Sequence, residues 1–157
     1  MRLVITSDTH GRHDLINDLP DGDVFVHAGD FMNSGLHPEE ILSFNRWLAK
    51  QPIKHRVVCG GNHDRLFQLS GFTSRDLLND ATYLENTGVT IGGISFWGSP
   101  YTPEFLRWAF MYSRGAEAKR FWAQIPTGSM TLSRTGRPTA YWTRLRLGRI
   151  LRIRRVA

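Results

Sequence analysis

The amino-acid sequence predicts an α/β layered domain. Short apolar runs at 3–6, 23–28 and 55–59 each end at a polar or glycine-containing cluster, which is typical of buried strands. Helical patterns at 13–19 and 38–50 separate these runs, and this alternation favours a parallel sheet. Ligands of such sheets bind beyond the carboxyl ends of the strands, so the residues there are the first candidates for a functional site.

The clearest helix is predicted at 38–50. Pro38 suits its first turn, and Glu39 and Glu40 suit the positive end of its dipole. Its apolar residues recur at helical spacing and mark one buried face: Ile41, Leu42, Phe44, Trp47 and Leu48. Farther along, we expect one or two short helices in 63–79, strands at 81–84, 89–91 and 94–97, and a helix at 116–124.

The net charge of +6 is distributed unevenly along the chain. Residues 1–128 hold 12 lysines and arginines and all 14 acidic residues, whereas residues 129–157 hold 8 arginines and no acid. The basic character therefore belongs to the last segment alone. A general nucleic-acid-binding domain is not indicated, because such a domain carries its basic residues across a folded face.

Cysteine content and hydropathy indicate the cellular compartment in which the protein is expected. Cys59 is the single cysteine, so no internal disulfide is possible and a reducing compartment is expected. Met1 leads directly into a strand-like run without the pattern of a signal peptide, and no apolar run reaches the length of a spanning helix. We expect a cytoplasmic protein with no membrane partner.

Four side chains with metal-binding atoms follow the three predicted strands. Asp8 and His10 come after the first, Asp30 after the second and Asn62 after the third. Residues two apart in an extended segment point the same way, so Asp8 and His10 can reach one ion, and the Asp30 carboxylate can bridge two. This ligand set lacks thiolate and suits Mn²⁺, Fe or Zn²⁺. Two such ions would activate a water molecule and stabilise a phosphate under attack.

Other polar residues beside these motifs are candidates for substrate chemistry. We expect His63 to face the substrate, where it would stabilise developing charge or protonate the leaving oxygen, and Asp64 to orient its imidazole. Asn33, Arg12 and Arg65 are candidate contacts for phosphate oxygens. A turn role suits Asn33 equally well, and exposed arginines are common without any ligand. His27 is predicted to be a buried, hydrogen-bonded histidine of the sheet.

Each motif alone is weak, but their order along the chain is informative. Segments 7–11, 27–30 and 60–64 resemble the calcineurin-like metallophosphoesterase superfamily. The stretch 92–100 is similar to one subgroup, the small phosphodiesterases that include metallophosphoesterase-domain-containing proteins. The resemblance covers residues 1 to about 128, which we take as the N-terminal portion of a metallophosphoesterase domain.

The resemblance implies a fold and a set of roles. It implies an α-β-β-α sandwich that hydrolyses phosphodiesters or phosphomonoesters, with cyclic nucleotides among the substrates of some members. It implies Asp8 and His10 on one metal, Asp30 bridging, and Asn62 on the second metal. His63 carries over as the histidine that faces the substrate.

The similarity stops near Gly128. The family continues with T-H-G-P-P and then G-H-x-H, but every histidine of this chain lies at or before His63. Read two bases later, permitted codons for 128–143 yield L-D-D-A-L-T-H-G-P-P-Y-G-I-L-D. We therefore hypothesise an insertion or deletion near Gly128. Residues 129–157 would then be a frameshifted Arg-rich tail that replaces the C-terminal part of the fold.

Two functions from different classes follow. The first is a metal-dependent phosphoesterase acting on a small phosphoester, with nucleotides among the candidates. In this chain it is expected to be impaired and to hold at most one ion tightly. The alternative is a catalytically inactive fragment or binding protein whose basic tail attracts nucleic acid or membrane. Metal stoichiometry and turnover separate the two.

Overall fold

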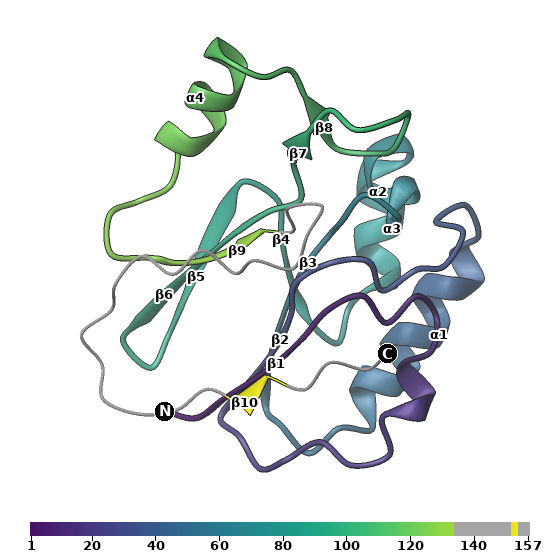
Figure 1. The fold of residues 1–157 in the computed structure, drawn as a ribbon. Coiled ribbons are helices and arrows are strands. Elements are labelled where there is room, and N and C mark those ends of the chain that lie inside the picture. The colour runs from purple at the N-terminus through teal and green to yellow at the C-terminus, as the bar shows by residue number, and fades with distance from the viewer. Residues whose placement is uncertain (134–151, 154–157) are drawn as a thin grey trace.

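The computed structural model describes residues 1–133 and 152–153. Most of the Arg-rich segment predicted at 129–157 lies outside this range. The described residues form two main sheets and a small two-stranded one, with helices against the largest sheet, which confirms the predicted α/β fold class (Figure 1). No helix of the described residues is long and apolar enough to cross a membrane.

The larger sheet is parallel throughout and carries the candidate site at one end. Its strands lie in the order β10-β1-β2-β3-β4. Their bounds are β10 Arg152–Ile153, β1 Leu3–Thr6, β2 Val24–His27, β3 His55–Cys59 and β4 Thr82–Leu84. Because β1, β2 and β3 are adjacent and parallel, the segments that follow them emerge at the same edge of the sheet.

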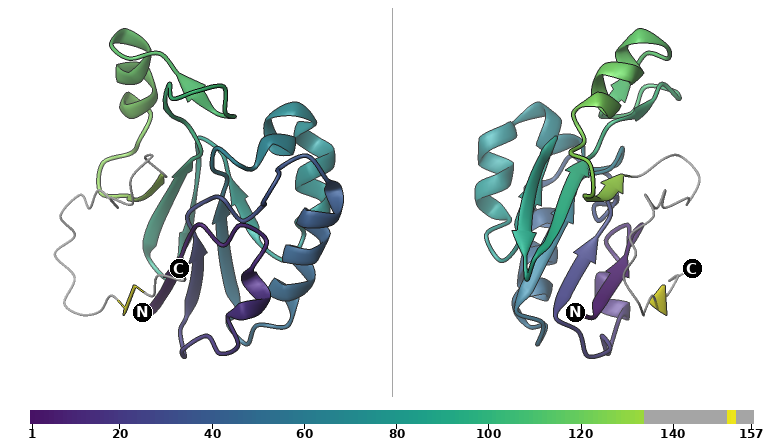
Figure 2. Two further views of the ribbon diagram at one scale, coloured as in Figure 1. Left: turned by 45° about the vertical axis from the view of Figure 1, so that its right-hand side comes forward. Right: turned by 90° about the vertical axis from the view of Figure 1, so that its left-hand side faces the viewer.

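Helices cover one face of this sheet (Figure 2). They are η1 His13–Leu15, α1 Pro38–Ala49, α2 Arg65–Leu69 and α3 Gly71–Leu77. The apolar side of α1 packs onto β1, β2 and β3, where Phe44 meets Phe25 and Val58 in a core that excludes water. Residues Phe25, Phe44 and Val58 are completely buried. Burial of aromatic side chains on this scale dominates the hydrophobic stabilisation of a domain of this size.

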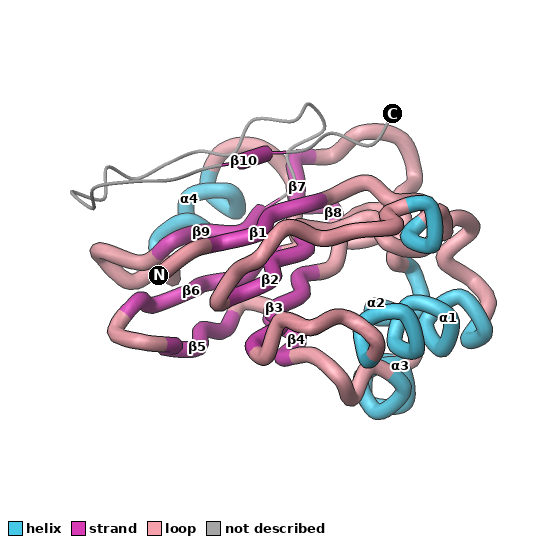
Figure 3. Tube along the Cα trace, turned by 90° about the horizontal axis from the view of Figure 1, so that it is seen from below, coloured by secondary structure: helices cyan, strands magenta, loops and turns pink. Residues whose placement is uncertain are grey.

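A second sheet packs on the opposite face of the first (Figure 3). It consists of β5 Thr87–Ile91, β6 Ile94–Ser99 and β9 Met130–Ser133 in the order β5-β6-β9. β5 and β6 form an antiparallel hairpin, and β9 runs parallel to β6. The core between the sheets joins Val26 and Val57 of the first sheet to Phe96, Met130 and Leu132 of the second.

Short elements lie beyond the ends of both sheets (Figure 1). β7 Thr102–Pro103 pairs with β8 Met111–Tyr112, and α4 Ala116–Ala123 follows them. Phe121 of α4 stacks on Tyr101 and Tyr112 with ring centroids 4.5 Å and 5.3 Å away. The segment between β7 and β8 reaches the candidate site, as described below.

Two local expectations differ from the structure. The helix predicted at 13–19 is only the 3₁₀ turn η1, because Asn17 and Asp18 compete for backbone hydrogen bonds and Pro20 disfavours a helical residue before it. Residues 130–133, expected within the tail, form β9 instead. Their alternation puts Met130 and Leu132 into the core between the sheets. The domain boundary at residue 128 stays a prediction.

Candidate metal centre

Three residues of the candidate site adopt a left-handed backbone. Asp8, His10 and Asp30 have φ angles of 58°, 44° and 57°. Such angles are uncommon outside glycine, and they cluster at functional sites where the surrounding structure holds them. Here the loops after β1 and β2 run side by side. Asp8 N donates to Gly29 O at 2.9 Å and His10 N donates to Asp30 O at 3.0 Å.

Three of the side chains at this edge converge on one point. Donor atoms of His10, Asp30 and His63 all lie within 4.8 Å of one another. His10 Nε2 is 3.9 Å from Asp30 Oδ2, which is beyond hydrogen-bond distance. Asp30 is completely buried, while the His10 side chain is 32% exposed. The cluster therefore combines a carboxylate held inside the protein with imidazoles that face outward.

The Asp30 carboxylate contacts the backbone of the third motif, residues 60–64. Its Oδ1 atom accepts a hydrogen bond from His63 N at 3.0 Å. A Cβ atom at Gly61 would lie 2.2 Å from the same oxygen, closer than any real contact. Gly61 is therefore required for this approach, because any larger residue there would displace the carboxylate.

His63 presents one ring nitrogen to the cluster. Its Nδ1 atom lies 2.9 Å from Asn33 O. A carbonyl oxygen can only accept, so Nδ1 carries the proton and Nε2 is the atom available to a metal ion or substrate. The His10 ring meets His63 edge to face, with centroids 4.5 Å apart and planes at 79°.

Asp64 differs from its predicted role of orienting the His63 imidazole. Its carboxylate accepts three backbone N–H groups instead: Oδ2 from Gly61 at 2.7 Å and Asp30 at 2.9 Å, and Oδ1 from Met32 at 2.9 Å. Burial raises the pKa of Asp64, and the nearby Asp30 raises it further, while the three donors act in the opposite direction. Asp64 thus fastens the loops after β2 and β3 together.

Glu40 supports the loop that holds His63. From the first turn of α1 its carboxylate accepts the backbone N–H of Ser34 at 3.0 Å, and it also bonds Asn33 N and the Ser34 hydroxyl. Burial acts to raise the pKa of Glu40, but these hydrogen bonds outweigh it and lower the pKa below its usual value. The acceptor of the His63 proton, Asn33 O, is fixed by this arrangement.

The remaining predicted site residues occupy the same edge of the sheet but differ in placement. Asp8 is partly buried and is not a member of the three-residue cluster, and Asn62 O accepts from Ala109 N at 3.3 Å. Asn33 and Arg12 are exposed. Arg65 donates to Arg107 O at 3.0 Å, and its guanidinium lies over an indole ring. Contacts of Asn33, Arg12 and Arg65 with phosphate stay predictions.

Trp108 is a site residue that the sequence did not reveal. Its indole stacks on the His63 imidazole, with ring centroids 4.2 Å apart and planes at 25°. It is also the ring that Arg65 covers, with the guanidinium carbon 4.8 Å from the centroid. Trp108 lies more than 40 positions after His63 in an irregular segment, so no local pattern connects the two residues. Only an alignment of relatives could have drawn attention to it.

His27 confirms the prediction of a buried, hydrogen-bonded histidine. Gly29 N donates to its Nδ1 atom at 3.3 Å, so Nε2 carries the proton and donates to the Thr9 hydroxyl at 3.1 Å. Burial lowers the pKa of His27 from 6.5 to about 3. Asp8 acts in the opposite direction, and His13 and His10 add to the lowering. The neutral ring joins β2 to the loop that follows β1.

We expect His27 to make the folded protein less stable as pH is lowered. The unfolded chain takes up a proton near pH 6.5 and the folded chain only near pH 3, so stability is lost as pH falls between these values. Between about pH 7.5 and about pH 5 the loss from this group is about 2 kcal/mol. Urea unfolding of metal-free protein at the two pH values measures it. In H27Q the loss should shrink by that amount, and an unchanged loss contradicts the assignment.

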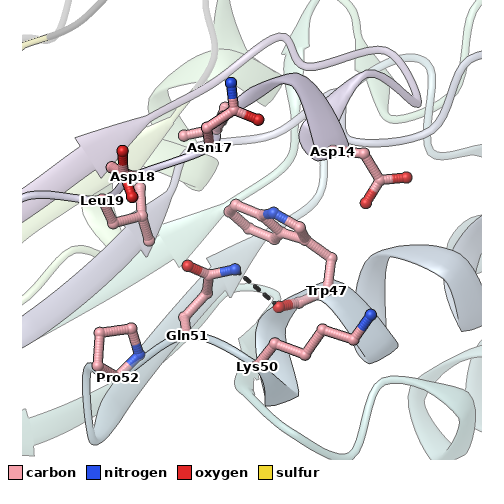
Figure 4. A pocket seen from close by; sticks show the side chains of 9 residues that line it. Asp14, Asn17, Asp18, Leu19, Trp47, Lys50, Gln51 and Pro52 are labelled. Atoms are coloured by element: carbon pink, nitrogen blue, oxygen red, sulfur yellow. Dashed lines mark hydrogen bonds between the residues drawn. The ribbon is translucent and has the colours of Figure 1, made fainter.

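A separate hollow of about 360 Å³ lies away from this centre, between the segment after η1 and the C-terminal end of α1 (Figure 4). Trp47 and Gln51 form part of its lining, with Gln51 Nε2 donating to Trp47 O at 3.0 Å. None of the predicted site residues lines it. The chemistry at the strand ends is therefore distinct from the hollow.

The fold brings His10, Asp30 and His63 together at the carboxyl ends of parallel strands, in a group that could hold a metal ion. The sequence matches the calcineurin-like phosphoesterase family over residues 1–139. The chain belongs to this family.

Similar proteins occur in animals and fungi. Metallophosphoesterase domain-containing protein 1 of Homo sapiens is 33% identical, over 95% of this chain and 53% of the human protein. A UPF0046 protein of Caenorhabditis elegans is 34% identical over 82% of this chain and 39% of its own length. Probable rhamnogalacturonate lyase C of Emericella nidulans is 35% identical over 97% of this chain and 15% of its own length. The chain thus spans about half the human protein.

Proposed function

We propose that this chain hydrolyses small phosphoesters with the help of a divalent metal ion bound at the strand ends. The observation that carries the proposal is the convergence of His10, Asp30 and His63 within 4.8 Å, with the Asp30 carboxylate completely buried. Family membership agrees with it, since the matched family consists of phosphoesterases.

The donor atoms fit a divalent ion. A buried carboxylate is costly without a positive charge beside it, and the 3.9 Å separation between Asp30 Oδ2 and His10 Nε2 is too long for a direct hydrogen bond. Imidazole and carboxylate ligands suit Mn²⁺, Fe or Zn²⁺. His10 and Asp30 would hold the ion, with Asp8 and Asn62 as the further ligands proposed from the sequence.

The chain's own residues supply binding and proton chemistry. When bound, the ion lowers the pKa of a water molecule and neutralises phosphate charge. When both ring nitrogens carry protons, His63 presents Nε2–H toward the phosphoester, where it donates that proton to the leaving oxygen or a hydrogen bond to the charged phosphoryl group. Asn33 and Arg12 contact phosphate oxygens from the exposed rim. Asp64 acts by holding the Asp30 and Gly61 loops in register.

We propose that one ion is held tightly. The first ion would be held by His10 and Asp30, whose Nε2 and Oδ2 atoms lie 3.9 Å apart. A second ion would depend on Asn62 and the shared Asp30 carboxylate. The substrate is proposed to be a small phosphoester, with nucleotides and cyclic nucleotides as candidates, and the chain is proposed to act in the cytoplasm without a membrane or nucleic-acid partner.

The variant D30N tests this function. Asparagine keeps an acceptor for His63 N but removes the negative charge that the Asp30 carboxylate would place beside the ion. Affinity for Mn²⁺ and hydrolysis of bis(p-nitrophenyl) phosphate should therefore both fall by at least about 100-fold. Substitution of a residue that only contacts a metal ligand already lowers metal affinity or activity about 10- to 100-fold. Calorimetric metal titration and release of nitrophenolate measure the two effects.

The control variant D14N removes a carboxylate that is exposed and outside the cluster, so it should leave both values unchanged. Hydrolysis that persists in D30N, or does not depend on added metal, contradicts the proposal. Tight binding of one ion without turnover of any phosphoester supports the alternative, a catalytically inactive binding protein.

A further inference from the structure

The segment that carries Trp108 is hydrogen-bonded to the third motif, residues 60–64, and to helix α2, which follows it. Arg65 donates to Arg107 O at 3.0 Å, Ala109 N donates to Asn62 O at 3.3 Å, and Phe110 N donates to the Gln68 side chain at 2.9 Å. Acceptors and donors of three residues around Trp108 are thus tied to residues 62–68. The backbone on both sides of Trp108 is therefore held beside residues 62–68, which keeps the indole within reach of His63.

The His63 imidazole is held from three directions. Its Nδ1 bonds Asn33 O, the His10 ring touches it edge to face, and the Trp108 indole covers one of its faces at 4.2 Å. A single hydrogen bond at Nδ1 leaves the ring free to swing about that bond. A stacked indole removes this freedom because rotation of the imidazole would collide with it or abandon the contact.

Arg65 keeps the indole in place. Its guanidinium carbon lies 4.8 Å from the ring centroid of Trp108, and the same group donates to the backbone carbonyl of Arg107. A guanidinium attracted to an aromatic ring adds to the stacking energy and fixes the orientation of the ring. The side chain of Arg65 is therefore occupied in supporting Trp108.

From these contacts we infer that Trp108 is a positioning residue for the proposed hydrolysis, and that it sets the direction of His63 Nε2 toward the leaving oxygen. The inference rests on the proposed function. Proton transfer to a leaving group is sensitive to small displacements of the acid. Loss of the indole should therefore harm reactions in which the leaving group needs a proton more than those in which it does not.

Kinetics of W108A and W108F with aryl methyl phosphodiesters of graded leaving-group acidity test this. We expect W108A to lower kcat about tenfold or more for the least acidic phenols, since proton transfer contributes 10²–10⁴-fold, and much less for nitrophenol. KM and Mn²⁺ affinity should change little. W108F should recover most of the loss, because phenylalanine restores a stacking face.

A matched control variant distinguishes loss of the stacking contact from a general loss of stability. F105A removes an aromatic side chain that is 69% exposed on the same segment, and it should leave the dependence on leaving group unchanged. An equal loss for every ester in W108A, or the same profile in W108A and F105A, would overturn the inference.

Ring protons of His63 in metal-free protein give a readout that needs no activity. Stacking on indole shifts their NMR signals upfield, and this shift should disappear in W108A and persist in F105A. Unchanged His63 signals in W108A would overturn the inference. If the wild-type chain hydrolyses none of the esters, the proposed hydrolysis fails, while the NMR comparison still decides whether Trp108 fixes the His63 ring.

Discussion

D64A is expected to lower the free energy of unfolding by about 3–9 kcal/mol, because it leaves three buried backbone N–H groups without an acceptor and each costs about 1–3 kcal/mol. The donors are those of Asp30, Met32 and Gly61, at 2.7–2.9 Å from the carboxylate. Asp64 is completely buried, so water cannot replace the lost acceptor without entering the core. Urea unfolding of metal-free protein measures the loss.

D64N separates hydrogen bonding from volume. An asparagine whose amide oxygen takes the place of Oδ2 retains the bonds from Asp30 and Gly61 but turns its NH₂ group toward Met32 N–H. It should therefore lie between wild type and D64A in stability. If D64N is as stable as wild type and D64A loses less than about 1 kcal/mol, Asp64 does not fasten the loops as described.

G35A is expected to disrupt the site through the backbone. Gly35 has a φ of 73°, and a Cβ atom there would lie 1.6 Å from His63 O. Leu66 N also donates to Gly35 O at 2.9 Å, so the two segments cannot separate without losing a hydrogen bond. The strain of the left-handed backbone and the collision together should cost more than about 3 kcal/mol and displace His63.

G93A is the matched control for this variant. Gly93 has a similar φ of 79°, yet a Cβ atom there meets nothing within 4 Å. The loss in G93A should be only about 1–2 kcal/mol, the cost of left-handed backbone for a residue with a side chain. Thermal unfolding of the two variants compares the strain with the collision. Equal losses of stability in the two variants would show that the collision of the added Cβ atom with His63 O contributes nothing.

Much of the fold was predictable because its signals are local. The apolar runs of β1, β2 and β3 and the helical stripe of α1 are periodic patterns that a single sequence displays. The grouping of Asp8, Asp30 and Asn62 at one sheet edge followed from parallel strands alone. β7 and β8 were missed because pairs of two residues leave no periodic signal.

The sequence by itself determined the class of protein, since the residue types after three strands fix the chemistry available there. Only the tertiary structure decided how those residues are held. It assigned Asp64 to three backbone donors, brought Trp108 onto His63, and placed the Gly35 backbone against the His63 carbonyl. Apart from the bond that Gly61 donates to Asp64, these contacts join residues about 30 to 45 positions apart. Their geometry depends on the packing of whole loops, which no local pattern records.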